Sequence, residues 1–88
     1  LKLQIMEITK TDQRILNKYL KGKNVTEALQ TPFKNVRGYA TEDNMALLIA
    51  TSSQRAGLTF IVALISLQRG WNSSIHTEGS HLVCLLYP

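Results

Sequence analysis

Two histidines and a cysteine near the C-terminus are the side chains whose types and spacing could support metal chemistry. His76, His81 and Cys84 fall within nine residues. A β-hairpin with its loop at Glu78 and Gly79 would place His76 opposite His81 on one face and Cys84 on the other face. A structural zinc site needs four converging ligands, which this arrangement does not provide. We therefore predict a surface histidine pair, a buried apolar cysteine, and no metal or other cofactor.

The positive charge of the chain is concentrated in its first half. The formal net charge is +4. Residues 1–40 hold eight lysines and arginines against three acids, and residues 41–88 hold two against three, so the two parts carry +5 and −1. A basic surface of this kind attracts phosphate groups or an acidic protein surface. The candidate binding residues are Lys10, Arg14, Lys18, Lys21, Lys23, Lys34 and Arg37.

Four of these cations belong to, or directly precede, a helix that the pattern predicts from about Asp12 to Lys21. Thr9 or Thr11 can cap its start, and Gly22 can end it. Its apolar residues fall on one side and its cations on the opposite side, with no acid among the cations. Two interpretations remain open: a solvated lysine face, as most surface helices have, or a stripe that contacts nucleic-acid phosphates.

A second, shorter helix is predicted to begin at Asn24, where Glu27 completes a capping-box pattern, and to end near Thr31 because Pro32 follows. Together with the basic residues after it, this helix suggests a helix-turn-helix motif. The detail fits that motif poorly. Pro32 stands where the motif usually has a glycine, and Gly38 weakens the would-be recognition helix.

One short segment carries a family resemblance. The residues Leu67-Gln-Arg-Gly-Trp71, followed by Gly79-Ser-His81, are similar to the helix–Gly-Trp–strand–Gly-Ser-His segment of HicA-type toxins, which are ribonucleases with a double-stranded-RNA-binding-like fold. The resemblance spans about 15 residues and implies that His81 is catalytic. The chain has no P-loop, nucleophile elbow or dinucleotide-binding glycine motif. We therefore expect a protein without enzymatic activity and keep a HicA-like ribonuclease as a minor alternative.

The apolar stretch from Ala56 to Leu67 is the centre around which the rest of the chain must pack. It lies late in a segment from Thr41 to Arg69 that reads mostly as helix. Ser52-Ser53 and Ala56-Gly57 are weak points, so one helix and two helices with a bend are both open. From Leu58 onward the stretch is apolar on nearly every side, which predicts a buried helix. Its β-branched residues leave a buried strand as the alternative, but the cap signals at both ends favour helix.

Strands are predicted at both ends of the chain. Residues 1–8 alternate between apolar and polar, as in a half-buried strand. Residues 71–77 and 80–87 form the predicted hairpin, and the second of these runs is apolar on both faces, which is typical of an interior strand. We therefore predict an α+β fold in two layers. A small three-stranded sheet, built from the N-terminal strand and the C-terminal hairpin, packs on helices that include one long buried central helix or helix pair.

Size and composition set further limits. With 88 residues and 44% hydrophobic content, residues 1–88 are expected to form a single small domain. One cysteine excludes an intrachain disulfide and favours a reducing, cytoplasmic location. The apolar run is shorter than the ~20 residues of a membrane span, and no signal-peptide pattern is visible. A homodimer is an option for so small a core.

The leading functional hypothesis is a small basic regulatory module that binds nucleic acid through the predicted basic helical face. The alternative is a protein-interaction module or small inhibitor that uses the same face to dock on an acidic partner protein.

Overall fold

The computed structural model describes residues 9–29, 33 and 35–88. In chain order these residues form α1 (Lys10–Tyr19), β1 (Val25–Leu29), β2 (Val36–Thr41), β3 (Ala46–Thr51), the 3₁₀ turn η1 (Ser52–Gln54), α2 (Arg55–Arg69), β4 (Asn72–Glu78) and β5 (His81–Tyr87). The described strands form one antiparallel sheet in the order β1-β2-β3-β5-β4. The predicted α+β class is therefore confirmed, whereas the predicted strand over residues 1–8 lies outside the described residues.

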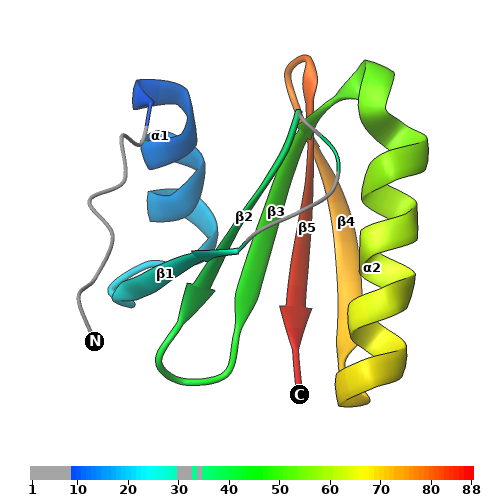
Figure 1. Cartoon of the computed structure of the whole chain (residues 1–88). Coiled ribbons are helices and arrows are strands. Elements are labelled where there is room, and N and C mark those ends of the chain that lie inside the picture. Colours follow the sequence, from blue (N-terminus) through cyan, green and yellow to red (C-terminus); the bar gives the residue numbers. More distant parts are fainter. Residues whose placement is uncertain (1–8, 30–32, 34) are drawn as a thin grey trace.

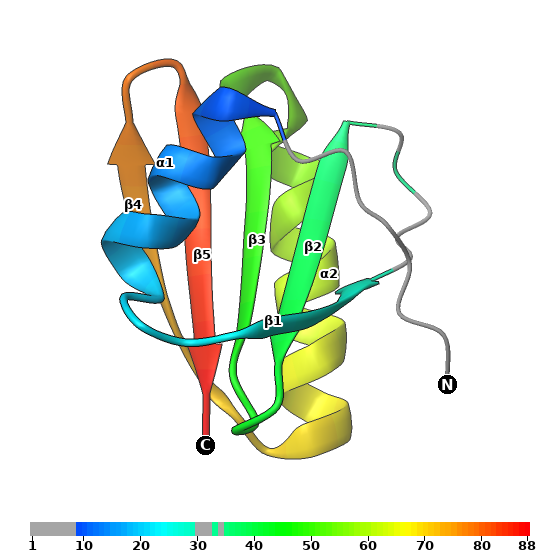
Figure 2. The same cartoon turned by 90° about the vertical axis from the view of Figure 1, so that its left-hand side faces the viewer.

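The two helices cover opposite faces of the sheet, so the fold has three layers rather than the predicted two (Figure 1). α2 connects β3 to β4, and β5 returns between them. Figure 2 shows α1 lying across β5 and β3, with α2 behind the sheet. The sheet has five strands where the sequence predicted three.

Alternation along the central strands supplies a core to each helix. Leu48 and Ala50 of β3 face α2, together with Leu82, Cys84 and Leu86 of β5. Leu47 and Ile49 of β3 and Val83 of β5 face α1. All of these side chains are at most 3% exposed. Because both faces of β3 and β5 are covered, these strands read as continuous apolar runs in the sequence.

The predicted long helix from Thr41 to Arg69 is wrong in its first part. Thr41 ends β2, and residues 46–51 form the central strand β3. Only residues 55–69 are α-helical, as α2, and Gly70 ends that helix in the left-handed conformation, as predicted. A short apolar run buried on both sides cannot be assigned to helix or strand from its spacing alone.

α2 is also less buried than predicted, because the sheet covers only one of its sides. Leu58, Ile61 and Val62 are buried against the sheet. Phe60 is 56% exposed and Leu67 is 85% exposed.

The helix predicted from Asn24 is wrong as well, because residues 25–29 form the edge strand β1. β1 pairs antiparallel with β2, so the backbone hydrogen bonds of the sheet prevail over the local capping-box pattern. Gly38 of the would-be recognition helix lies in the strand β2 instead. The helix-turn-helix hypothesis is therefore excluded.

The C-terminal hairpin is confirmed, with a register that differs from the prediction by one position on each strand. Glu78 pairs with His81 and His76 pairs with Val83, so the loop is Gly79 and Ser80. Gly79 has φ +62°, which a glycine adopts without strain. The faces agree with the prediction: both histidines lie on the face of Val83, and Cys84 lies on the opposite face.

Gly38 of β2 allows two leucines from the flanking strands to approach each other above it. A Cβ atom at this position would lie 2.9 Å from Leu48 Cδ2 and 3.0 Å from Leu29 Cβ, closer than van der Waals contact permits. We expect Gly38→Ala to lower the free energy of unfolding by about 1–3 kcal/mol, as overpacking does in a tight core. Urea denaturation measures the change.

The Leu48→Val background provides the control for this prediction, because valine lacks the methyl group nearest to the new Cβ. The added methyl at position 38 should cost less in that background. An equal cost in both backgrounds would contradict the steric explanation.

Candidate nucleic-acid interface

The outer side of α1 presents the cations that the sequence analysis proposed for binding. Thr9 caps the helix by accepting a hydrogen bond at its Oγ1 atom from the Asp12 backbone N–H, at 3.1 Å. Ile15, Leu16 and Leu20 are buried against the sheet. The opposite side therefore faces outward, and it carries the exposed side chains of Lys10, Arg14, Lys18 and Lys21, the last of which follows the helix. The only acid on α1, Asp12, is buried.

Asp12 fixes the start of α1 to strand β2. Its carboxylate accepts hydrogen bonds from Arg37 Nε at 2.6 Å, from Arg37 Nη2 at 2.8 Å and from the Tyr39 hydroxyl at 2.8 Å. Burial acts to raise the pKa of Asp12, but the hydrogen bonds from Arg37 and Tyr39 and the Arg37 charge outweigh it, so the pKa lies below its ordinary value. Burial and the bond to Asp12 raise the pKa of Tyr39 to about 12.

Arg37 is consequently a structural residue in this fold. Its two-pronged bond to a fully buried carboxylate compensates the charge of Asp12, which would otherwise be costly to bury. Its partner Asp12 lies 25 residues away in the chain, so local spacing could not reveal this structural role of a candidate binding residue.

Two more candidate cations are engaged in ion pairs at the surface. Lys18 Nζ lies 2.7 Å from Glu78 at the tip of β4. The Tyr19 hydroxyl donates a hydrogen bond to the same carboxylate, and these two bonds lower the pKa of Glu78. Lys23 pairs with Asp43 in the turn between β2 and β3. Lys18 is still 61% exposed at its side chain, so it can also contact a ligand.

Lys10, Arg14 and Lys21 remain exposed, and within the described ranges none of them forms an ion pair with a carboxylate. Arg14 and Lys18 also line a shallow surface hollow between α1 and the β4–β5 loop, where Gly79 forms part of the wall. Lys34 lies outside the described residues. The structure thus brings four of the seven candidates together on one outward surface, which we call the α1 basic face: Lys10, Arg14, Lys18 and Lys21.

Both histidines lie on the face of the sheet that α1 covers, the face of Val83. His76 stacks against Tyr19 with 5.0 Å between ring centroids and contacts Ser74 Oγ at 3.0 Å through Nε2. His81, the residue that the family resemblance marks as catalytic, begins β5 and pairs with Glu78 across the hairpin. Burial raises the pKa of the Cys84 thiol to about 11. Across residues 9–29, 33 and 35–88, no three His, Cys, Asp or Glu side chains group as metal ligands would.

Neither of the helices in the described part of the chain is long and apolar enough to cross a membrane. A scan against protein-family models, a search of the curated proteins and a search of the solved structures each found no match. The catalytic role of His81 that the HicA resemblance implies stays a prediction.

Proposed function

We propose that this protein is a small non-enzymatic module that binds nucleic acid through the α1 basic face. The observation that carries the proposal is the set of four exposed cations on the outward side of α1 and the residue just after it, Lys21, while the only acid of that helix is buried. α1 is held to the sheet by its apolar side and by Asp12, so these cations project from a fixed support. A row of cations on a rigid helix suits the regular spacing of phosphates along a nucleic-acid backbone.

The expected mode of binding is electrostatic and independent of base sequence. Tyr19, the aromatic residue on α1, donates a hydrogen bond to Glu78 and its ring contacts the ring of His76, so it is poorly placed to stack on a base. Gly38, which the helix-turn-helix hypothesis placed in a recognition helix, lies in β2, a strand inside the sheet. Contacts to phosphate without contacts to bases predict weak discrimination between sequences and a strong dependence on salt.

Salt-dependent binding provides the test. We expect fluorescein-labelled single-stranded and duplex oligonucleotides of mixed sequence to bind at low salt, as measured by fluorescence anisotropy. In the Arg14→Gln/Lys21→Gln variant, two phosphate contacts are lost. The slope of log K against log salt should then decrease by about 1.8 for duplex DNA and about 1.4 for a single strand.

The matched control is Arg55→Gln/Arg69→Gln, which removes the same charge from α2 on the other face of the sheet. This variant should bind with nearly the wild-type slope. No binding at low salt would contradict the proposal. An equal decrease of the slope in the two double variants would also contradict it, because the net charge of the protein alone would then explain the binding.

The second candidate, a module that docks on an acidic protein surface, is favoured by the ion pairs. Three of the six candidate cations that the structure describes have carboxylate partners within the chain, so the surface offers separate, directional charges rather than a continuous basic field. Saturable binding to one protein, without affinity for polyanions, would support this candidate. A cytoplasmic location and a homodimeric state belong to the same proposal and rest on the sequence arguments alone.

A further inference from the structure

An apolar pocket lies on the face of the sheet opposite the α1 basic face. α2 packs on β3, β5 and β4, so the helix lies over this half of the sheet rather than over β1 and β2 (Figure 1). Two small residues of the sheet line the pocket: Ala40 of β2 and Ala46 of β3, which pair with each other. Larger side chains, among them Leu29 and Leu64, stand around them. The result is a half-open cavity of about 210 Å³.

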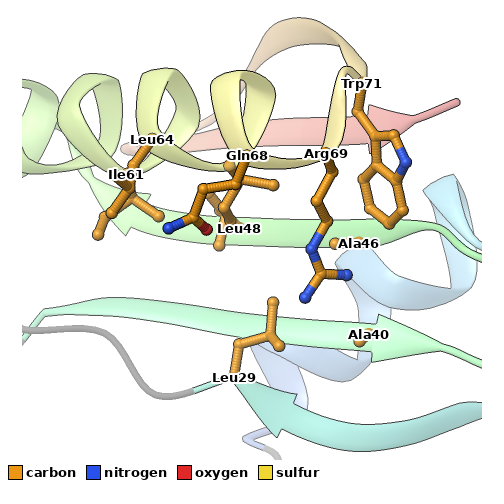
Figure 3. A pocket seen from close by; sticks show the side chains of 10 residues that line it. Leu29, Ala40, Ala46, Leu48, Ile61, Leu64, Gln68, Arg69 and Trp71 are labelled. Atoms are coloured by element: carbon orange, nitrogen blue, oxygen red, sulfur yellow. The ribbon is translucent and has the colours of Figure 1, made fainter.

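Among the described residues that line this pocket, one side chain is charged. Arg69, the last residue of α2, extends its guanidinium group across the pocket toward β1 and β2 (Figure 3). The guanidinium carbon lies 5.1 Å from the centroid of the Trp71 ring, which forms the end wall of the pocket. Among the residues whose side chains the structure describes, which excludes Glu27 of β1, no carboxylate pairs with Arg69, and α2 contains no acid. Gln68 adds an amide at the same rim.

We propose that this pocket binds a small amphipathic acid, with an apolar body in the hollow and a carboxylate on Arg69. The size supports the choice: an engineered cavity of ~150 Å³ in another protein holds benzene, so about 210 Å³ suits a body of roughly eight carbon atoms. The chemistry supports it too. An apolar lining with a single guanidinium group at the rim matches a ligand that is apolar except for one anionic head.

The charge of the pocket argues against a second copy of the chain as its occupant. Two copies that meet through α2 would each bring Arg69 and Arg55, with no acid on that helix to pair with them. A free carboxylate instead supplies the missing negative charge. This site lies on the opposite face of the sheet from the α1 basic face, so the proposal stands or falls separately from nucleic-acid binding.

Octanoate, octylammonium and 1-octanol are suitable probes, because they share one apolar chain and differ in the charge of the head group. Isothermal titration calorimetry gives their affinities, and the fluorescence of Trp71, the only tryptophan of the chain, reports whether the pocket is the site. We expect octanoate to bind about tenfold or more tightly than octylammonium, since a carboxylate gains a charge-assisted bond to Arg69 where an ammonium group is repelled.

Two variants and one control locate the site. Arg69→Gln should abolish the preference for octanoate and leave the affinity for octanol within about twofold, whereas Arg55→Gln, at the other end of the same helix, should preserve the preference. Ala40→Leu fills the hollow and should weaken all three probes about tenfold or more. Circular dichroism checks that each variant is folded.

Three results would overturn the proposal. The first is equal affinity of the wild type for octanoate and octylammonium. The second is an octanoate preference that survives in Arg69→Gln. The third is no binding of octanoate at ~10 mM, where even a ligand with a millimolar dissociation constant would occupy most sites. A dimer that occludes the pocket, detected by sedimentation, would produce this third result.

Discussion

An Asp12→Asn variant is expected to unfold with a free energy about 2–4 kcal/mol lower than that of the wild type. The carboxylate is fully buried and accepts three hydrogen bonds, two from Arg37 and one from Tyr39. Asparagine has the same shape but offers one acceptor oxygen and no charge. Arg37 then loses its counterion, and part of the buried hydrogen-bond network is unsatisfied. Removing one partner of a buried ion pair is more destabilising than replacing both partners. Urea denaturation at pH 7 measures the loss.

The pH dependence identifies the charge as the cause. Because the folded-state pKa of Asp12 is lower than its ordinary value of 3.8, the ionised carboxylate stabilises the fold above that value. The contribution is lost as the pH falls through the folded-state pKa. The difference in stability between wild type and Asp12→Asn should therefore be largest near neutral pH and should shrink below about pH 4.

Glu78→Gln is the matched control, since it removes an equivalent charge from an exposed ion pair with Lys18. Surface pairs contribute little because water screens them, so this variant should remain close to the wild type. Equal losses in the two variants would show that the burial of Asp12 has no special importance.

The first helix was predictable because its signals are local. A capping threonine, an alternation of apolar and basic sides at helical spacing, and a glycine that follows all lie within 14 residues, and the structure places α1 at Lys10–Tyr19 with Thr9 as its cap. Gly22 has φ +74°, as expected of a residue that turns the chain after a helix. The hairpin was predictable for the same reason, since Gly79 marks its turn.

The middle strands were missed because the information that fixes them is not local. β1 and β2 are strands through their pairing with each other and with β3, although the sequence of β1 begins like a helix. Burial of β3 between two helices removes the alternation that would identify a strand. Tertiary pairing overrides local propensity in such segments.

The candidate site was predictable in part, because only some of its features depend on neighbouring residues in the chain. Counting charges along the chain correctly finds the basic helix, because its cations are neighbours on one surface. Counting cannot show that Arg37 and Lys18 have partners, since Asp12 and Glu78 lie 25 and 60 residues away from them. The pocket at Arg69 was missed because its walls come from β1, β2, β3 and α2, which are brought together only by the fold.

Leu48→Ala is expected to lower the free energy of unfolding by about 2–5 kcal/mol. Leu48 is 0% exposed at the centre of β3, where it packs between Gly38 of the neighbouring strand and the buried side of α2. Truncation to alanine leaves a cavity that the surrounding strands, each fixed by backbone pairing, cannot collapse to fill. Chemical denaturation followed by far-ultraviolet circular dichroism measures the loss.

Leu67→Ala on α2 makes this prediction a test of the fold as well as of the core. Both leucines belong to the segment that the sequence suggested was a long buried helix, and in such a helix both truncations would be costly. In the observed fold Leu67 is 85% exposed, so its truncation should change stability by no more than about 0.5 kcal/mol. A large loss from Leu67→Ala in the monomer would contradict the placement of α2 on the sheet. A loss that appears only at high protein concentration would instead locate a contact between copies of the chain on the outer side of that helix.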